Sequence, residues 1–251
     1  MSEGSLGKSV GYMSIEDPLA IEAVEAIQSG NVKRLRQLLK KDPALATVRL
    51  GDGSKSRTLL HVATDWPGNF LNGSEIVAIL VASGADVNAR IVGPHHAETA
   101  LHWAASSDDA AVLDALLDLG ADLEAGGGVI GNGTPIADAT AFGQWKAARR
   151  LIERGAKTTL WQAASLGLMD RVAGFFVGDS MPSSDDVTAA FWCACHGGQQ
   201  QAAEYLLGQG ADLNWIGYDQ LTPLDAARRS KAPDLVEWLS ARGAKSASAL
   251  P

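Results

Sequence analysis

Apolar residues recur at helical spacing in short stretches, and a glycine follows each stretch. Residues 76–80 and 112–117 carry apolar side chains that fall on one helical face, which predicts amphipathic helices with a buried stripe. Gly84 and Gly120 come shortly after these stretches, and glycine readily adopts the left-handed conformation that ends a helix. The pattern therefore predicts short helices that each stop at a glycine.

The phrase around this glycine is repeated along the chain. It reads SGADVN at 83–88, LGADLE at 119–124, RGAK at 154–157, QGADLN at 209–214 and RGAK at 242–245. Glycines of neighbouring copies lie 36 (84 to 120), 35 (120 to 155) and 33 (210 to 243) residues apart. A period in the thirties indicates stacked helical repeats, whose extended surface is suited to binding rather than to catalysis.

A second phrase precedes each glycine and predicts the start of another helix. A threonine followed by a proline favours helix entry, because the hydroxyl can cap free amides and proline suits the first helical position. The alanines that follow allow neighbouring helices to approach closely. The copies are TLLHVA at 58–63, TALHWAA at 99–105, TPIADA at 134–139 and TPLDAA at 222–227, with divergent copies TLWQAA at 159–164 and AFWCAC at 190–195.

Together the two phrases resemble the ankyrin repeat family, whose Thr-Pro-Leu-His opening and Gly-Ala-Asp close they match over roughly residues 19–247. The resemblance implies an all-α ankyrin-repeat solenoid of about seven helix-turn-helix repeats with short hairpin fingers. We expect one ankyrin-repeat domain over residues 18–247. The Gly- and Ser-rich residues 1–17 are expected to be disordered.

Composition narrows the possible partners. The chain has 251 residues and a formal net charge of −8, which disfavours nucleic-acid binding because that needs a basic face. No apolar run is long enough to span a membrane, and the N-terminus lacks a signal-peptide apolar region. Cys193 and Cys195 lie two residues apart on a predicted helix and point in different directions, so a disulfide is not expected, and a reducing, cytoplasmic setting is.

Three irregularities interrupt the repeat pattern, and irregular positions of a repeat protein often carry function. About five extra residues stand at 66–73, between the two helices of one repeat. The connector at 90–98 is long and holds His95 and His96, and the next connector, 125–133, is mostly glycine. After Gly155 the connector is nearly absent, so a finger is expected to be missing there.

The resemblance implies a concave surface built from the first helix of each repeat and from the fingers. Aligning the repeats to that pattern predicts these binding residues: Asp65, Trp66, Trp103, Ser106, Asp138, Phe142, Gln162 and His196. The expected function is recognition of a protein or peptide partner along this groove. Because tryptophan and aspartate dominate its middle, the partner is expected to carry a cationic group, such as an Arg or Lys side chain or an amine.

Two alternatives stay open at this point. Trp66 could pack on its own loop and Trp103 under a finger, with no role in binding. Alternatively, the central Trp/Asp/His region is a closed small-molecule pocket or catalytic site, with Asp65 or Asp138 as general acid or base and the fingers as lids. An open groove would favour a peptide, and a closed pocket would favour a small molecule. An enzyme is the less favoured interpretation.

Other chemistry-bearing residues are better explained by structure. His61 and His102 stand where the family's histidine bonds to the neighbouring repeat, and Trp161, Trp192 and Asp225 are expected to fill the same layer. Cys193-Ala194-Cys195-His196 lacks the second cysteine pair of a structural zinc site, so no metal and no cofactor is expected. The glycines at 126–133 lack the Lys-Ser/Thr ending of a phosphate-binding loop, which indicates a finger tip.

Overall fold

The structure is a computed structural model that describes residues 11–94, 97–178 and 181–250. Contacts divide the chain into two compact units, residues 1–151 (unit 1) and residues 152–251 (unit 2). The single ankyrin-repeat domain expected over residues 18–247 therefore stays a prediction. His95 and His96 lie outside the described residues.

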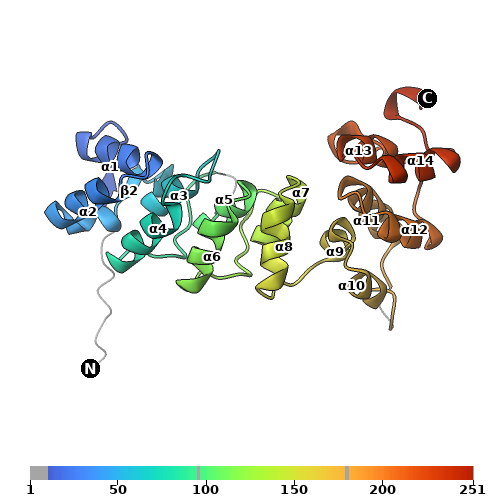
Figure 1. Ribbon diagram of the computed structural model, residues 1–251, viewed down its shortest axis with the longest axis horizontal. Coiled ribbons are helices and arrows are strands. Elements are labelled where there is room, and N and C mark those ends of the chain that lie inside the picture. Colours follow the sequence, from blue (N-terminus) through green and yellow to red (C-terminus); the bar gives the residue numbers. More distant parts are fainter. Residues whose placement is uncertain (1–10, 95–96, 179–180, 251) are drawn as a thin grey trace. The chain divides into compact units, whose positions relative to one another are not determined.

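Unit 1 consists of helix pairs, and Figure 1 shows the first helices of the pairs lying next to one another. Neighbouring first helices are in contact, α1 with α3, α3 with α5 and α5 with α7, and so are the second helices α2 with α4 and α4 with α6. The helices are α1 (Pro18–Gln28), α2 (Val32–Lys41), α3 (Leu59–Thr64), α4 (Gly73–Ala82), α5 (Ala100–Ser106), α6 (Ala110–Asp118), α7 (Pro135–Ala141) and α8 (Trp145–Glu153), with the 3-10 turn η1 (Pro43–Ala46). The boundary between the units, after Leu151, falls within the last turn of α8.

The caps of these helices are those that the sequence predicts. Thr58 and Thr99 precede α3 and α5 in extended backbone conformation. Gly84 (φ +104°) and Gly120 (φ +93°) follow α4 and α6 in the left-handed region, as predicted. Short helices of this length are marginal alone, so they depend on packing against their neighbours. The number of about seven repeats stays a prediction.

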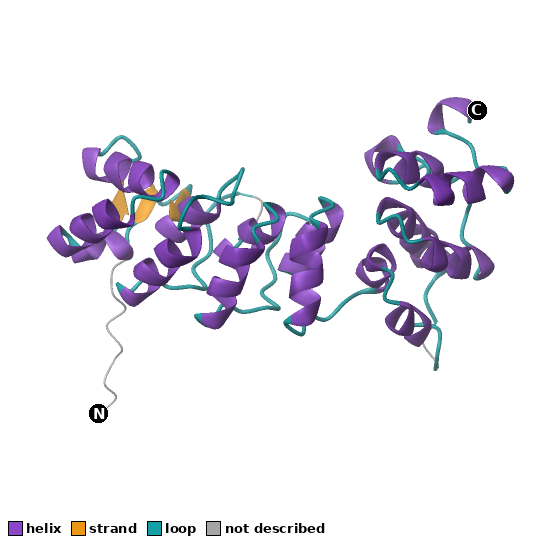
Figure 2. Ribbon diagram, in the orientation of Figure 1, coloured by secondary structure: helices purple, strands orange, loops and turns teal. Residues whose placement is uncertain are grey.

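A small sheet departs from the all-α prediction. Strand β2 (Arg49–Gly51) pairs antiparallel with β3 (Ser56–Thr58) as the hairpin finger, and β1 (Tyr12–Met13) pairs parallel with β2. Figure 2 draws these strands in orange beside the first helix pairs. The sheet forms because the hairpin leaves one edge unpaired and the segment before α1 satisfies it. Residues 11–17 thus include a strand instead of the predicted disorder, while residues 1–10 lie outside the described residues.

Long polar side chains tie each finger of unit 1 to the next. Arg49 Nη2 donates to the carbonyl oxygen of Arg90, and Arg90 Nη1 donates to that of Gly126. Asn88 Nδ2 likewise donates to the Gly120 carbonyl at 3.1 Å. These bonds satisfy backbone carbonyls and fix the order of the fingers along unit 1.

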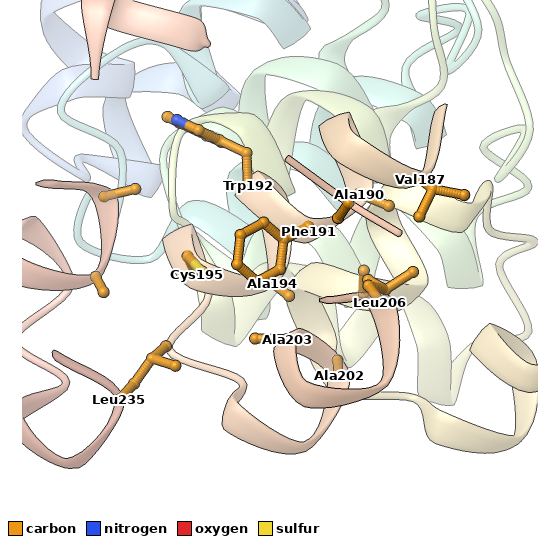
Figure 3. Close-up of a cluster of buried hydrophobic side chains, with 14 of the residues drawn as sticks. Val187, Ala190, Phe191, Trp192, Ala194, Cys195, Ala202, Ala203, Leu206 and Leu235 are labelled. Atoms are coloured by element: carbon orange, nitrogen blue, oxygen red, sulfur yellow. The ribbon is translucent and has the colours of Figure 1, made fainter. Parts of the chain in front are cut away.

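Unit 2 has its own continuous core. Its elements are α9 (Leu160–Leu166), α10 (Met169–Gly174), α11 (Ser184–His196), α12 (Gln200–Gly208), α13 (Pro223–Arg229) and α14 (Pro233–Ala241), with the 3-10 turns η2 (Tyr218–Gln220) and η3 (Ala247–Ala249). Phe191 on α11 is fully buried. Figure 3 shows its ring among small and branched side chains such as Ala194, Ala203 and Leu235. Helix α11 contacts α9, α12 and α13, so it is the central element of this core.

Candidate functional site

The ends of the first helices in unit 1 place two large aromatic side chains in solvent. Trp66 is 80% exposed just after α3, and Phe142 is 50% exposed just after α7. Each stands eight residues after the threonine that precedes its helix (Thr58 to Trp66, Thr134 to Phe142). Ser106 is the last residue of α5, which lies between α3 and α7 in the row of first helices. Three of the predicted site residues therefore lie at corresponding ends of neighbouring helices.

Asp65 organises the surface rather than offering a free carboxylate. Its Oδ1 accepts a hydrogen bond of 2.9 Å from the Trp66 backbone N–H, and its Oδ2 accepts one from Arg57 Nη1. The Arg57 and Asp65 side chains are only 35% and 30% exposed. A partly buried ion pair of this kind fixes the orientation of both groups.

Trp103 lies on α5 and faces the same arginine. The Arg57 guanidinium carbon lies 5.9 Å from the centre of the Trp103 ring, within the range of a cation–π contact. The Trp103 ring also meets the His61 ring edge-on, with ring centres 5.2 Å apart. Arg57 thus joins Asp65 and Trp103 into one cluster, which we call the Arg57 cluster. Sequence reasoning missed Arg57, although its place directly before Thr58 on the finger could have indicated it.

The extra residues at 66–73 form a loop that bridges neighbouring helix pairs. The Asn69 backbone N–H donates to Asp109 Oδ2 at 2.7 Å, and Asn72 Nδ2 donates to the Gly30 carbonyl at 3.0 Å. The Trp66–Pro67 peptide bond is cis. The loop is therefore attached to turns of the pairs before and after it, while the Trp66 side chain stays exposed. The interpretation in which Trp66 packs on its own loop is not supported by this exposure.

Asp138 is not a surface residue. It is fully buried (0% exposed) on α7, and its Oδ1 accepts a hydrogen bond of 3.1 Å from the Ile130 backbone N–H in the glycine-rich finger. Its Oδ2 has no hydrogen-bond partner among the described residues. Burial raises the pKa of Asp138 to about 7, and the nearby Glu98 charge adds to this rise. Asp138 therefore holds the finger against α7, and the prediction that it lines an exposed surface is corrected.

The buried histidines hold neighbouring repeats together, as their positions predict. The Thr58 backbone N–H lies 3.3 Å from His61 Nδ1 and donates to it, so His61 Nε2 carries the proton that bonds the Glu98 carbonyl at 3.1 Å. His102 repeats this arrangement with Thr99 and the Gly133 carbonyl. Desolvation lowers the pKa of His61 to about 3, so it stays neutral.

The predicted site residues of unit 2 have separate surroundings. Gln162 Oε1 accepts the Thr159 backbone N–H at 2.7 Å, so this side chain caps α9. His196 Nδ1 lies 3.3 Å from Arg229 Nη2, and the His196 and Trp192 ring centres are 5.4 Å apart. Gln162 and His196 are not assigned to the Arg57 cluster, because they belong to unit 2.

We call the positions of His61 and His102, together with their counterparts in the other repeats, the histidine layer. Trp192 fills this layer, and Trp161 does not. Trp192 Nε1 donates to the Leu221 carbonyl at 2.8 Å, which is the bond that His61 and His102 make in unit 1. Trp161 is 41% exposed, and Gln162 takes the third helical position instead. The expectation for Trp161 was wrong because the divergent copy begins its helix at Leu160, so the histidine position falls one residue later.

The two cysteines are suited to packing. Burial raises the pKa of the Cys193 thiol to about 12 and that of Cys195 further still, so neither forms a reactive thiolate at neutral pH. Within the described residues, no group of three or more His, Cys, Asp or Glu side chains could hold a metal ion.

Three clefts of the described residues are lined by residues other than those of the Arg57 cluster. One of about 410 Å³ lies between the 69–75 loop and the start of α6, at Asp109, Ala111 and Val112. Another of about 520 Å³ lies in unit 2 beside Lys157, Arg171 and Phe175. A third, of about 410 Å³, lies where α14 begins, at residues 228–236. The expected closed pocket around Trp103 and Asp138 does not coincide with any of these three clefts.

Comparison with known proteins agrees with the helix pairs and their caps. Models of the ankyrin repeat match residues 55–91 and 96–125. An ankyrin repeat and KH domain-containing protein of Caenorhabditis briggsae is 30% identical over 179 residues, which cover 68% of this chain and 7% of that relative. The chain therefore belongs to the ankyrin repeat family, and it spans a small part of the length of the curated relative it matches. Ankyrin repeats generally mediate protein–protein interaction.

Among the residues that the structure describes, no helix has both the length and the apolar character needed to cross a membrane.

Proposed function

We propose that this chain is a protein-binding module and that unit 1 recognises a protein or peptide segment across the ends of α3, α5 and α7. The observation that carries the proposal is Trp66, an 80% exposed tryptophan whose backbone is fixed by Asp65. A large exposed aromatic side chain on a fixed backbone is a typical binding anchor, because little conformational entropy is lost when it is buried. Phe142, half exposed beyond α7, extends the surface along the row of first helices.

The closed-pocket alternative and the cationic partner have less support. Both depend on Asp65 and Asp138 as available carboxylates. Asp65 uses both oxygens within the chain, and Asp138 is fully buried beneath the glycine-rich finger. The net charge of −8 also keeps a nucleic acid the less favoured partner, as expected from the sequence. An uncharged or anionic protein segment is therefore the better match.

A crosslinking experiment tests the proposal in the native host. A photoreactive amino acid replaces Trp66 in one variant and Val177 in the control, because Val177 is equally exposed (79%) but belongs to unit 2. We expect a discrete protein to crosslink to position 66 and not to position 177. In calorimetry with that purified protein, Trp66→Ala should raise Kd about tenfold or more, which corresponds to roughly 1.4 kcal/mol or more.

The thermal midpoint of Trp66→Ala should stay close to that of the wild-type chain, because the removed ring is exposed. A partner that binds Trp66→Ala as tightly as the wild-type chain would contradict the proposal.

A further inference from the structure

Arg57 keeps unused hydrogen-bond donors close to Trp66, next to a carboxylate that is already engaged. Both carboxylate oxygens of Asp65 are engaged, one by the Trp66 backbone and one by Arg57 Nη1. Nε and Nη2 of Arg57 make no hydrogen bond within the described residues. The Ser106 hydroxyl, at the end of α5, is buried and has no hydrogen-bond partner among the described residues. Nε and Nη2 of Arg57 are therefore hydrogen-bond donors left to bind a ligand here.

The finger that carries Arg57 has an excess of positive charge. Residues 49–58 carry Arg49, Lys55 and Arg57 against one acidic residue, Asp52, on a chain with a net charge of −8. Arg49 and Arg90 donate to backbone carbonyls, which satisfy their N–H groups without neutralising their charge. Glu98, in the connector at 90–98, is buried and already interacts with another group of the chain.

The arginines also act on the buried histidines. The charges of Arg49 and Arg57 help to lower the pKa of His61, and the charge of Arg90 helps to lower that of His102 while Asp122 opposes it. Desolvation is the larger cause in both cases. The arginines nevertheless act in the direction that a locally positive field requires.

The Arg57 guanidinium is also held in one orientation. Asp65 bonds one of its nitrogens, and the Trp103 ring lies beneath its carbon at 5.9 Å. A guanidinium presents its N–H donors in a planar fork that matches a carboxylate, and less entropy is lost when the fork is already fixed. Arginine and tryptophan are also the residue types most enriched among binding hot spots.

We propose that the partner of unit 1 is an acidic peptide segment that places an Asp or Glu carboxylate on Arg57 and an apolar side chain against Trp66. This inference rests on the proposed function and names the chemistry of its partner. It reverses the sign expected from the sequence, because Arg57 already supplies the cation that was expected from the ligand.

Selection from a phage-displayed library of random 12-residue peptides on the full chain tests the inference. Enriched peptides should combine Asp or Glu with an aromatic or branched apolar residue. Binding of one synthetic selected peptide is then measured by fluorescence polarisation. Its affinity should fall with added NaCl, and replacing its acidic residues by Asn or Gln should weaken binding about tenfold or more.

Matched variants locate the contact on the chain. Arg57→Gln should weaken the selected peptide about tenfold or more, and Arg57→Lys by less, because Lys keeps the charge but not the fork. Arg149→Gln, which removes an exposed arginine of α8, is the control and should leave the affinity unchanged. Circular dichroism checks that each variant is folded, and the altered peptide tests the same contact without changing the protein.

The outcomes separate the inference from the function on which it rests. If selected peptides are basic, or depend on Trp66 but not on Arg57, the acidic partner is wrong and the binding surface stands. If neither Trp66→Ala nor Arg57→Gln affects binding, or if no peptide is enriched, both proposals fail. A 20-nucleotide single-stranded RNA that competes with the selected peptide and binds more tightly would overturn the peptide assignment.

Discussion

At the residue scale, Asp138 illustrates how a carboxyl group can serve the fold instead of a ligand. One oxygen holds the Ile130 backbone N–H, and the other has no hydrogen-bond partner within the described residues. An unpartnered buried oxygen is tolerable when the group is protonated, because the neutral form loses less hydration. Its burial could not be predicted from the repeat pattern, since it depends on a glycine-rich finger folding back over α7.

This burial predicts a pH-dependent stability. The folded-state pKa of Asp138 is raised to about 7 from its usual value of 3.8, so the folded chain keeps a proton that the unfolded chain has lost. Its stabilising contribution is present in full below about pH 4 and is lost as the pH rises to about 7, by on the order of 1.4 kcal/mol per pH unit.

Urea unfolding between pH 4.5 and 7.5 measures this contribution. The free energy of unfolding of the wild-type chain, relative to Asp138→Asn, should fall steadily across the window because Asn does not titrate. Asp170→Asn, which removes an exposed carboxylate on α10, controls for general charge effects. A wild-type minus Asn difference that stays constant with pH would show that Asp138 is ionised throughout.

Trp192 makes a second residue-scale prediction. Its indole N–H donates to the Leu221 carbonyl at 2.8 Å, and its side chain is only 3% exposed. Trp192→Phe keeps an aromatic ring but leaves that carbonyl unpaired, so the free energy of unfolding should fall by about 1–3 kcal/mol. Trp161→Phe is the matched control, because Trp161 is 41% exposed, and it should change stability by less than about 0.5 kcal/mol. If the two substitutions lowered the free energy of unfolding equally, the stabilising role assigned to the Trp192–Leu221 hydrogen bond would be wrong.

At the scale of elements, the caps were predictable and the contacts between fingers were not. Thr58 precedes the first helix of its pair and Gly84 follows the second, as the sequence indicates, because capping depends on a few neighbouring residues. The pairing of β1 with β2, and of Arg57 with Asp65, joins segments whose proximity only the packed structure defines. The sequence placed Trp66 and Trp103 in the candidate site, whereas the contacts of Arg57 with Asp65 and Trp103, on which the proposed acidic partner rests, could not be predicted from it.

The glycine-rich finger gives an element-scale prediction. A Cβ at Gly128 would lie 2.7 Å from Asp138 Oδ2 and 2.9 Å from the Gly133 carbonyl oxygen, which is too close. Gly128→Ala should therefore lower the free energy of unfolding by about 1–3 kcal/mol, because the finger must move away from α7. Gly126→Ala is the control, since its Cβ would come no closer than 3.4 Å to the Asn132 carbonyl oxygen.

Chemical denaturation of both variants distinguishes a packed finger from a loose one. If Gly128→Ala and Gly126→Ala were equally stable, the finger would not be held against Asp138.

At the scale of the whole molecule, the histidine layer differs along the chain. His61, His102 and Trp192 each bond a carbonyl just before the next first helix, at Glu98, Gly133 and Leu221 respectively. The corresponding residue on α7 is Ala137, which has no side-chain donor. The short connector after Gly155 also lacks a strand within the described residues. The sequence shows both features, whereas the division of the chain between residues 151 and 152 follows only from the contacts of the fold.

The core of unit 2 supports the last prediction. Phe191 is fully buried on α11, the helix that contacts α9, α12 and α13. A stack of helix pairs shares one core, so Phe191→Ala should cost about 3–5 kcal/mol and lower hydrogen-exchange protection throughout that core, in α9, α11 and α13. Val177→Ala is the control, because Val177 is 79% exposed, and it should leave the protection unchanged. A loss of protection confined to α11 would mean that the helix pairs of unit 2 are stabilised one by one, and the shared core inferred from their packing would be wrong.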